Sequence, residues 1–184
     1  MNNFEIDDCL KSMEIIVDTR EQPSTRAQRR YNSFCVPFKR QTLNYGDYTY
    51  NFRLPNGEML FGEEETVKGH VVVERKQDLA ELSQCFCQSR ERFEREFERA
   101  KENNATIYLL VEDSTWENLI NGKYSTKFNS KAFFSSITAW MARYDIKVIF
   151  CKSETSGKII KEVLYRELKE KLQRGYYDGV CEDR

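Results

Sequence analysis

The run Val71-Val72-Val73-Glu74-Arg75-Lys76 restricts the fold and the function of this chain more than any other stretch. Three consecutive β-branched residues, preceded by Gly69 and His70, are typical of a buried strand. The strand ends in three charged side chains, and burying a charge costs free energy unless the charge is paired or binds a metal. We therefore predict that the end of this strand is either a cap of ion pairs or a functional site.

A second motif, Gly46-Asp47-Tyr48, precedes this strand. Gly46 permits a tight turn, and the aromatic and β-branched residues that follow it favour a strand. Residues 54–58, Leu-Pro-Asn-Gly-Glu, are typical of a hairpin turn, so the two strands should lie side by side and bring Asp47 near Glu74. Two neighbouring carboxylates repel unless a cation lies between them. Hard oxygen ligands around a cation, with a lysine beside them, suit phosphodiester hydrolysis.

Two further motifs flank this pair in the sequence. They are Ile15-Ile16-Val17-Asp18-Thr19-Arg20-Glu21 and Arg92-Phe93-Glu94-Arg95-Glu96-Phe97-Glu98-Arg99-Ala100. Together with Gly46-Asp47-Tyr48 and Glu74-Arg75-Lys76, they resemble the nuclease domain of the XPF (ERCC4-type) family of structure-specific DNA endonucleases, in a stand-alone form of the phage or bacterial kind. Four motifs in the family's order are far more specific than one motif alone.

The resemblance implies a fold and an activity. The expected fold is α/β, a restriction-endonuclease-like mixed β-sheet flanked by helices, which the order of predicted elements also favours. The expected activity is that of an Mg²⁺-dependent endodeoxyribonuclease, for which Mn²⁺ could substitute. It would hydrolyse phosphodiester bonds in branched or otherwise structured DNA, in DNA repair or recombination.

The resemblance also implies roles for individual residues. The expected catalytic residues are Asp18, Asp47, Glu74, Arg75 and Lys76. Asp47 and Glu74 would bind the metal directly, with Asp18 as a nearby or water-mediated ligand. The backbone carbonyl of Arg75 could supply another oxygen ligand. Lys76 would orient or help deprotonate the attacking water, or stabilise charge on the phosphate oxygens. On the sequence alone, Asp18 could equally be a turn or cap residue.

Ala80 departs from the family pattern, which has an Asp four residues after the lysine. Asp78 and Glu81 lie nearby but are out of register. This departure keeps open an alternative function, a catalytically idle relative that binds DNA or a protein. A structural alternative also remains, in which Glu74, Arg75 and Lys76 form an ion-pair network at a strand end, although it does not explain Asp18 and Asp47.

Binding to DNA has to come from a local basic surface, because the net charge is −1 with 29 basic and 30 acidic residues. The arginines expected to contact the DNA backbone are Arg20, Arg26, Arg29, Arg30, Arg90 and Arg92. Basic residues mixed with an aromatic such as Tyr31 can bind a DNA backbone. The alternative is a solvated helix and loop.

We divide the chain into a flexible lead (residues 1–12), a single nuclease domain (13–172) and a C-terminal tail (173–184). Helical periodicity is predicted for residues 90–101, 130–144 and 156–172. The last two segments carry more large apolar residues than one sheet face needs, which favours a homodimer. A partner protein that supplies selectivity for DNA structure is the alternative.

The six cysteines are expected to be free, buried thiols rather than disulfides or a zinc site, since Cys85-Phe86-Cys87 does not have zinc-ligand spacing. The single histidine, His70, excludes sites built from several histidines. No apolar run is long enough for a membrane span, and the N-terminus does not resemble a signal peptide. We therefore expect the cytoplasm, or the host cytoplasm if the chain is phage-encoded, as the location.

Overall fold

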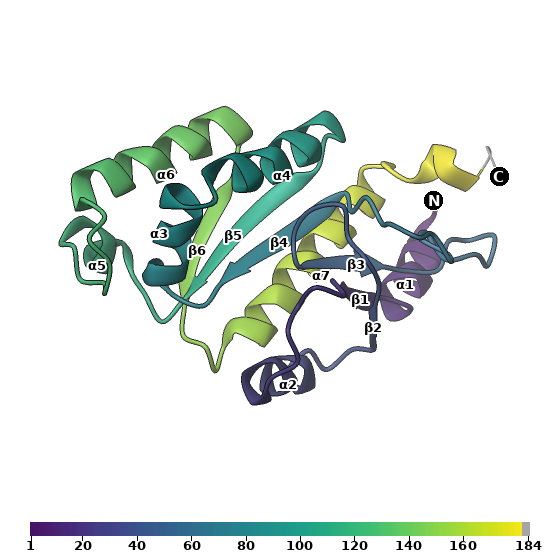
Figure 1. Ribbon diagram of the computed structural model, residues 1–184. Helices are drawn as coiled ribbons and strands as arrows, with labels where there is room; N and C mark the ends of the chain where they lie inside the picture. The colour runs from purple at the N-terminus through teal and green to yellow at the C-terminus, as the bar shows by residue number, and fades with distance from the viewer. Residues whose placement is uncertain (182–184) are drawn as a thin grey trace.

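A six-stranded mixed β-sheet with helices on both faces forms the centre of the computed structural model, which describes residues 1–181 (Figure 1). Along the chain, the described elements are α1 (Asn3–Lys11), β1 (Glu14–Val17), α2 (Thr25–Asn32), β2 (Phe38–Arg40), β3 (Tyr48–Asn51), β4 (Val71–Lys76), α3 (Leu79–Cys87), α4 (Arg90–Glu102), β5 (Thr106–Glu112), α5 (Trp116–Ile120), α6 (Ser130–Tyr144), β6 (Lys147–Cys151), α7 (Ser156–Gln173) and the 3₁₀ helix η1 (Asp178–Cys181).

The strand order in the sheet is β2-β1-β3-β4-β5-β6. Strand β3 pairs antiparallel with both β1 and β4, whereas β4, β5 and β6 run parallel to one another. The parallel strands are joined by helical crossovers, as parallel pairing requires. The predicted mixed sheet flanked by helices is therefore confirmed.

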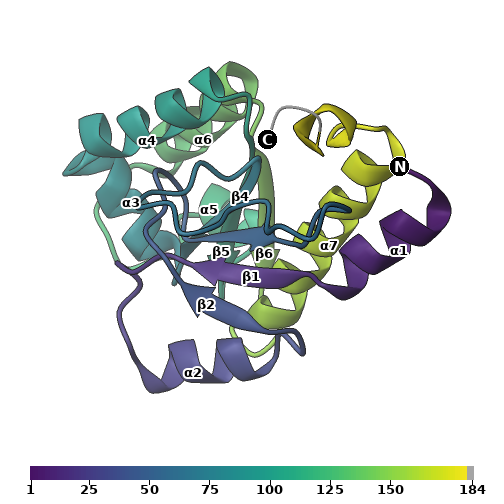
Figure 2. The same ribbon diagram turned by 90° about the vertical axis from the view of Figure 1, so that its right-hand side faces the viewer.

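Strand β4 separates two hydrophobic cores. Val71 and Val73 belong to the core under α1, α2 and α7, whereas Val72 belongs to the core under α3, α4 and α6, because successive side chains of a strand point to opposite faces. Figure 2 shows α7 on one side of the sheet and α4 with α6 on the other. Trp140 of α6 is fully buried and fixes the second core, since its ring lies 5.2 Å from that of Phe93 in α4.

The beginning of the chain differs from the prediction. Residues 1–12 were expected to be a flexible lead, but α1 occupies most of them. The Asn2 side chain accepts hydrogen bonds from the backbone N–H groups of Phe4 and Glu5, and the Glu5 carboxylate accepts one from the backbone N–H of Asn2. Ile6, Cys9 and Leu10 are buried at helical spacing. This capping box and this apolar spacing are both visible in the sequence.

The C-terminal segment is also more ordered than the predicted tail. Tyr177 is fully buried, and its hydroxyl lies 2.6 Å from that of Tyr50 in β3 and 3.0 Å from His70 Nδ1. Burial, aided by Lys171, lowers the pKa of His70 to about 4. Residues 173–181 therefore pack on the domain, and residues 182–184 lie outside the described part of the chain.

The connection between β3 and β4 contains the predicted turn. The backbone N–H of Gly57 donates to the Leu54 carbonyl, at 2.9 Å. However, β3 ends at Asn51 and β4 begins at Val71, so a long irregular segment follows the turn. The exposed acidic residues 63–65 lie in that segment, as expected for a solvated loop.

None of the helices within residues 1–181 is long and apolar enough to cross a lipid bilayer. Cys35, Cys85, Cys87 and Cys151 are free thiols, but the prediction that the thiols are buried is wrong for Cys35 and Cys87, which are exposed.

Candidate active site

Two strand ends bring Asp47 and Glu74 together. The backbone N–H of Asp47 donates to the Val73 carbonyl (2.9 Å), and the Asp47 Oδ2 accepts from the backbone N–H of Arg75 (2.7 Å). Gly46 makes this approach possible, because its φ is +73° and a Cβ there would lie only 2.8 Å from the Val72 Cβ. The predicted proximity of the two motifs is therefore what the structure shows.

The alternation of β4 places Glu74 and Lys76 on one face and Arg75 on the other. Glu74 and Lys76 form an ion pair and are both buried. The Lys76 ammonium also lies 5.1 Å from the centre of the Phe93 ring of α4. Lys76 is thus held in a fixed position on the same face of the sheet as Glu74, and it lines the same cavity as Asp47.

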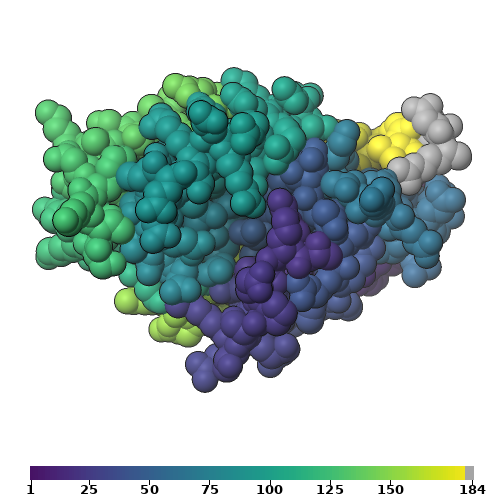
Figure 3. Space-filling model, in the orientation of Figure 1, coloured from purple at the N-terminus to yellow at the C-terminus, as the bar shows by residue number. Residues whose placement is uncertain are grey.

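A cavity of about 270 Å³ opens over these residues. Its carboxylates are Glu21, Asp47, Glu74 and Glu96, its cations are Arg20, Lys76 and Arg92, and its remaining lining is Gly46, Cys85, Ser89 and Phe93. In the space-filling view, the purple segment after β1 meets the teal surface of α3 and α4, and the surface is hollowed along their boundary (Figure 3). The cavity is therefore formed by segments that are far apart in the sequence.

The carboxylates of this cavity destabilise one another's charge. Burial, and next the charge of Glu74, raises the pKa of Asp47 to about 8, although Lys76 acts in the opposite direction. Burial also raises the pKa of Glu74 against the effect of Lys76. Burial alone would lower the pKa of Lys76, but Glu74 and Asp47 outweigh it and raise that pKa. A cation placed between the two carboxylates would relieve this repulsion.

The donor set fits a divalent metal that keeps most of its water. Among residues 1–181, no group of three or more Asp, Glu, His or Cys side chains is gathered closely enough to hold a metal by itself. Two carboxylates with oxygen donors are nonetheless what Mg²⁺ requires in many sites, because it retains several water ligands. Asp47 and Glu74 are the two residues that would hold it.

The structure does not bring Asp18 into this group as a metal ligand. Its buried carboxylate accepts hydrogen bonds from the Arg20 backbone N–H (2.9 Å) and Nε (2.8 Å), and it also pairs with Arg20 Nη2. Asp18 thus does not line the cavity but holds Arg20 at its edge, and its role as a nearby or water-mediated ligand stays a prediction.

The side chain of Arg75 is likewise not in the cavity. It lies on the opposite face of the sheet, with Nε 3.4 Å from Glu21 Oε1 and Nη1 3.4 Å from Glu112 Oε2. Its contribution to the cavity is the backbone N–H that holds Asp47. The predicted basic role of the Arg75 side chain in the site is therefore wrong, because the two-residue period of the strand places it on the opposite face. The Arg75 carbonyl as a metal ligand stays a prediction.

Glu21 and Glu96 are cavity residues that the sequence did not single out. Glu21 lies three residues after Asp18 in the first motif, and the Tyr48 hydroxyl donates to it. Glu96 lies one helical turn after Arg92 on α4, 3.8 Å from Arg20 Nη1. Helical spacing from Arg92 and Phe93 could have indicated Glu96, whereas the position of Glu21 depends on contacts made by the folded chain.

Helix α3 contains Ala80 at the position where the family pattern has an Asp, and no neighbouring carboxylate replaces that Asp in the cavity. Asp78 caps α3 by accepting from the Glu81 backbone, and Glu81 accepts from the Gln77 backbone. Neither carboxylate lines the cavity. Helix α3 thus contributes Cys85, and no carboxylate, to the site.

The predicted DNA-binding arginines fall into four groups. Arg20 and Arg92 line the cavity, and Arg29 and Arg90 are exposed. Arg26 is paired with Glu112 and Asp113. Arg30 is the correction: its side chain is only 2% exposed and pairs with Glu21 and Glu112, so it cannot reach a DNA backbone.

The chain is similar in sequence to one protein family and in structure to solved proteins. The model of the ERCC4 domain matches residues 17–163. The solved structure of XPF from Aeropyrum pernix has 18% sequence identity and a TM-score of 0.56, over 82% of this chain and 64% of that chain. XPF from Aeropyrum pernix in complex with DNA has 18% identity and a TM-score of 0.57, over 85% and 65%. No curated protein matches the chain.

The chain thus spans just under two thirds of the length of these XPF chains. At this identity the likeness shows the fold alone. The predicted sheet and helices of the nuclease fold are confirmed by it.

Proposed function

Because the chain belongs to the ERCC4 domain family of nucleases, we propose that it is a metal-dependent endonuclease that hydrolyses phosphodiester bonds in branched or structured DNA. The observation that carries this proposal is the gathering of Asp47, Glu74 and Lys76 in one cavity at the ends of β3 and β4. Mg²⁺, or Mn²⁺ in its place, is the proposed metal, since its hard-oxygen preference suits two carboxylates.

Each residue has a distinct part in the proposed reaction. Asp47 and Glu74 would hold the metal, which would polarise the phosphate and activate a water when bound. Lys76 presents its ammonium beside them, where negative charge develops on the phosphate oxygens during cleavage. Arg20 and Arg92 lie at the edge of the cavity, where they can hold the DNA backbone by its phosphates.

The alternative is a catalytically idle relative that binds DNA or a protein, which Ala80 alone favours. The two functions are separated by incubating the protein with flap, fork, junction and linear duplex DNAs in Mg²⁺ or Mn²⁺. We expect cleavage of the branched DNAs, at or near the branch. Tight binding of these DNAs without cleavage under any metal condition would favour the idle relative.

Arg92→Ala is expected to weaken DNA binding and to reduce the slope of log affinity against log salt by about 1, because one phosphate contact is lost. The matched control is Arg95→Ala on the same helix, whose side chain is exposed and pairs with Glu91 away from the cavity. Fluorescence anisotropy over a range of salt concentrations measures the DNA affinity and its salt dependence for each variant. Equal weakening by the two variants would contradict a specific contact by Arg92.

The argument for a homodimer, that α6 and α7 carry surplus apolar residues, is not supported by their burial. The large apolar residues of α6 and α7, such as Phe133, Ile137 and Leu164, are buried within the chain, and Phe134 is the exposed exception on α6. Pairing of two copies, or a partner that selects the DNA structure, therefore stays a prediction. The cytoplasm, or the host cytoplasm, remains the proposed location.

A further inference from the structure

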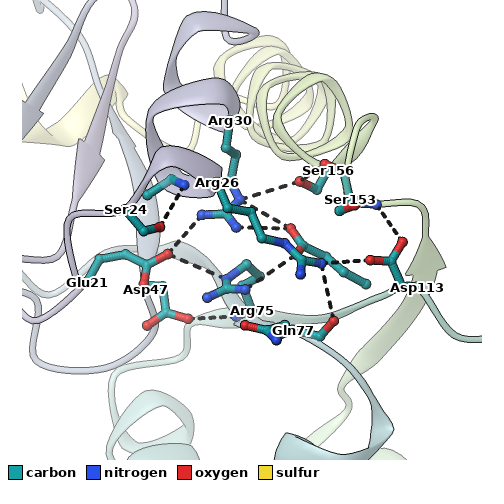
Figure 4. Close-up of polar contacts among 12 residues, drawn as sticks. Glu21, Ser24, Arg26, Arg30, Asp47, Arg75, Gln77, Asp113, Ser153 and Ser156 are labelled. Carbon is teal, nitrogen blue, oxygen red and sulfur yellow. Dashed lines mark hydrogen bonds and ion pairs between the residues drawn. The ribbon is translucent and has the colours of Figure 1, made fainter.

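A buried cluster of charges lies behind the cavity, on the face of the sheet covered by α2 and α7 (Figure 4). We call it the arginine–carboxylate cluster; it consists of Arg26, Arg30, Arg75, Glu21, Glu112 and Asp113. Three guanidinium groups face three carboxylates, so the cluster is neutral. Burying this many charges is tolerable only because each has a partner of opposite sign.

Glu112 is the centre of this cluster. It is the last residue of β5 and is completely buried. Its Oε1 lies 3.1 Å from Arg30 Nη2, and its Oε2 lies 3.4 Å from Arg75 Nη1 and 2.9 Å from Arg26 Nη2. One carboxylate thus fixes guanidinium groups from α2 and β4 at the same time.

Two of these arginines also contact a carboxylate that lines the cavity. Arg30 Nη1 lies 3.0 Å from Glu21 Oε1, and Arg75 Nε lies 3.4 Å from the same oxygen. Glu21 itself lines the cavity beside Asp47. Arg30 and Arg75 therefore each join Glu112, which does not touch the cavity, to Glu21, which does.

We propose that Glu112 is a positioning residue of the nuclease site: it holds Arg30 and Arg75 in the orientation that keeps Glu21 against the cavity and the Arg75 backbone against Asp47. The proposal rests on the proposed nuclease function. Without the charge of Glu112, Glu21 is the carboxylate that remains paired with Arg30 and Arg75. The two guanidinium groups then draw Glu21 away from the cavity. Groups that orient metal ligands from behind affect metal affinity or activity ten- to a hundredfold.

The test is Glu112→Gln, which keeps the shape of the side chain and removes its charge. We expect kcat to fall by about ten- to a hundredfold, with the KM for DNA unchanged, and Mn²⁺ affinity in the absence of DNA to fall by a similar factor. Calorimetric titration with Mn²⁺ and steady-state cleavage measure these quantities. The matched control is Asp113→Asn, at the outer, partly exposed end of the cluster. Asn tolerates the left-handed backbone of this position (φ 49°). The Asp113→Asn protein should have the kcat and Mn²⁺ affinity of the parent.

Removal of one buried partner can also unfold a protein. The double variant Arg26→Gln, Glu112→Gln therefore accompanies the single one, because it removes one cation with one anion and leaves the cluster neutral. A folded double variant with reduced kcat and reduced Mn²⁺ affinity supports the positioning role.

Two results would overturn the proposal while the nuclease function stands. One is a folded Glu112→Gln protein with parental kcat and Mn²⁺ affinity. The other is that neither variant folds, since Glu112 would then serve folding alone. A parent protein that neither binds Mn²⁺ nor cleaves DNA would refute the nuclease function itself, and the positioning role with it.

Discussion

Lys76→Met is expected to reduce the cleavage rate at saturating DNA by about a hundredfold or more, with little change in DNA affinity. The ammonium is buried between Glu74 and the Phe93 ring, so no other cation can take its place without rearrangement. A positioned charge matters most where charge develops in the transition state. DNA affinity sums over many phosphate contacts, of which Lys76 supplies at most one.

Single-turnover cleavage and anisotropy measure the two quantities separately. Lys158→Met on the exposed side of α7 is the control for loss of a positive charge. Equal losses of binding and cleavage would contradict a role in the chemical step. Unfolding of Lys76→Met, monitored by circular dichroism, would instead favour the structural interpretation of the strand end as an ion-pair network.

Asp47→Asn is expected to abolish detectable cleavage and at the same time to stabilise the metal-free protein. The folded-state pKa of about 8 lies above the ordinary value of 3.8, so the folded protein binds this proton more tightly than the unfolded chain. The stability that Asp47 contributes is therefore fully present below about pH 4 and is lost as the pH rises to about 8. Asn keeps the acceptor for the Arg75 N–H without that loss.

Thermal unfolding in EDTA at pH 4 and at pH 8 measures this effect. At pH 8 the variant should exceed the parent by on the order of 1–3 kcal/mol, and at pH 4 the two should be nearly equal. Adding Mg²⁺ should stabilise the parent and leave the variant unchanged, because metal binding stabilises only the state that binds it. A less stable variant at pH 8 would contradict the repulsion between Asp47 and Glu74.

Much of this fold could be predicted from local patterns. The apolar run at β4 predicted a buried strand, and the turn residues between β3 and β4 predicted their antiparallel pairing. The approach of Asp47 to Glu74 followed from that pairing. Helix α1 was also readable, because Asn2 and Glu5 form a capping box before buried residues at helical spacing.

What could not be predicted depends on distant partners. Arg26 and Arg30 were assigned to DNA because basic residues mixed with an aromatic such as Tyr31 can bind a DNA backbone, yet Glu112, 82 positions after Arg30, pairs with both. Tyr177 is buried because it meets Tyr50 from β3, 127 positions earlier. Arg75 is a different case, since the strand period was available and would have placed it opposite Glu74 and Lys76.

The central claim is that Asp47 and Glu74 hold a divalent metal on which DNA cleavage depends. Its most direct test is cleavage of a flap DNA by the parent protein as Mg²⁺ is titrated, chelated with excess EDTA, and then replaced by Mn²⁺. If Asp47 and Glu74 hold such a metal, cleavage by the parent protein will saturate with Mg²⁺, stop in EDTA and return with Mn²⁺. Cleavage that continues undiminished in excess EDTA would contradict it.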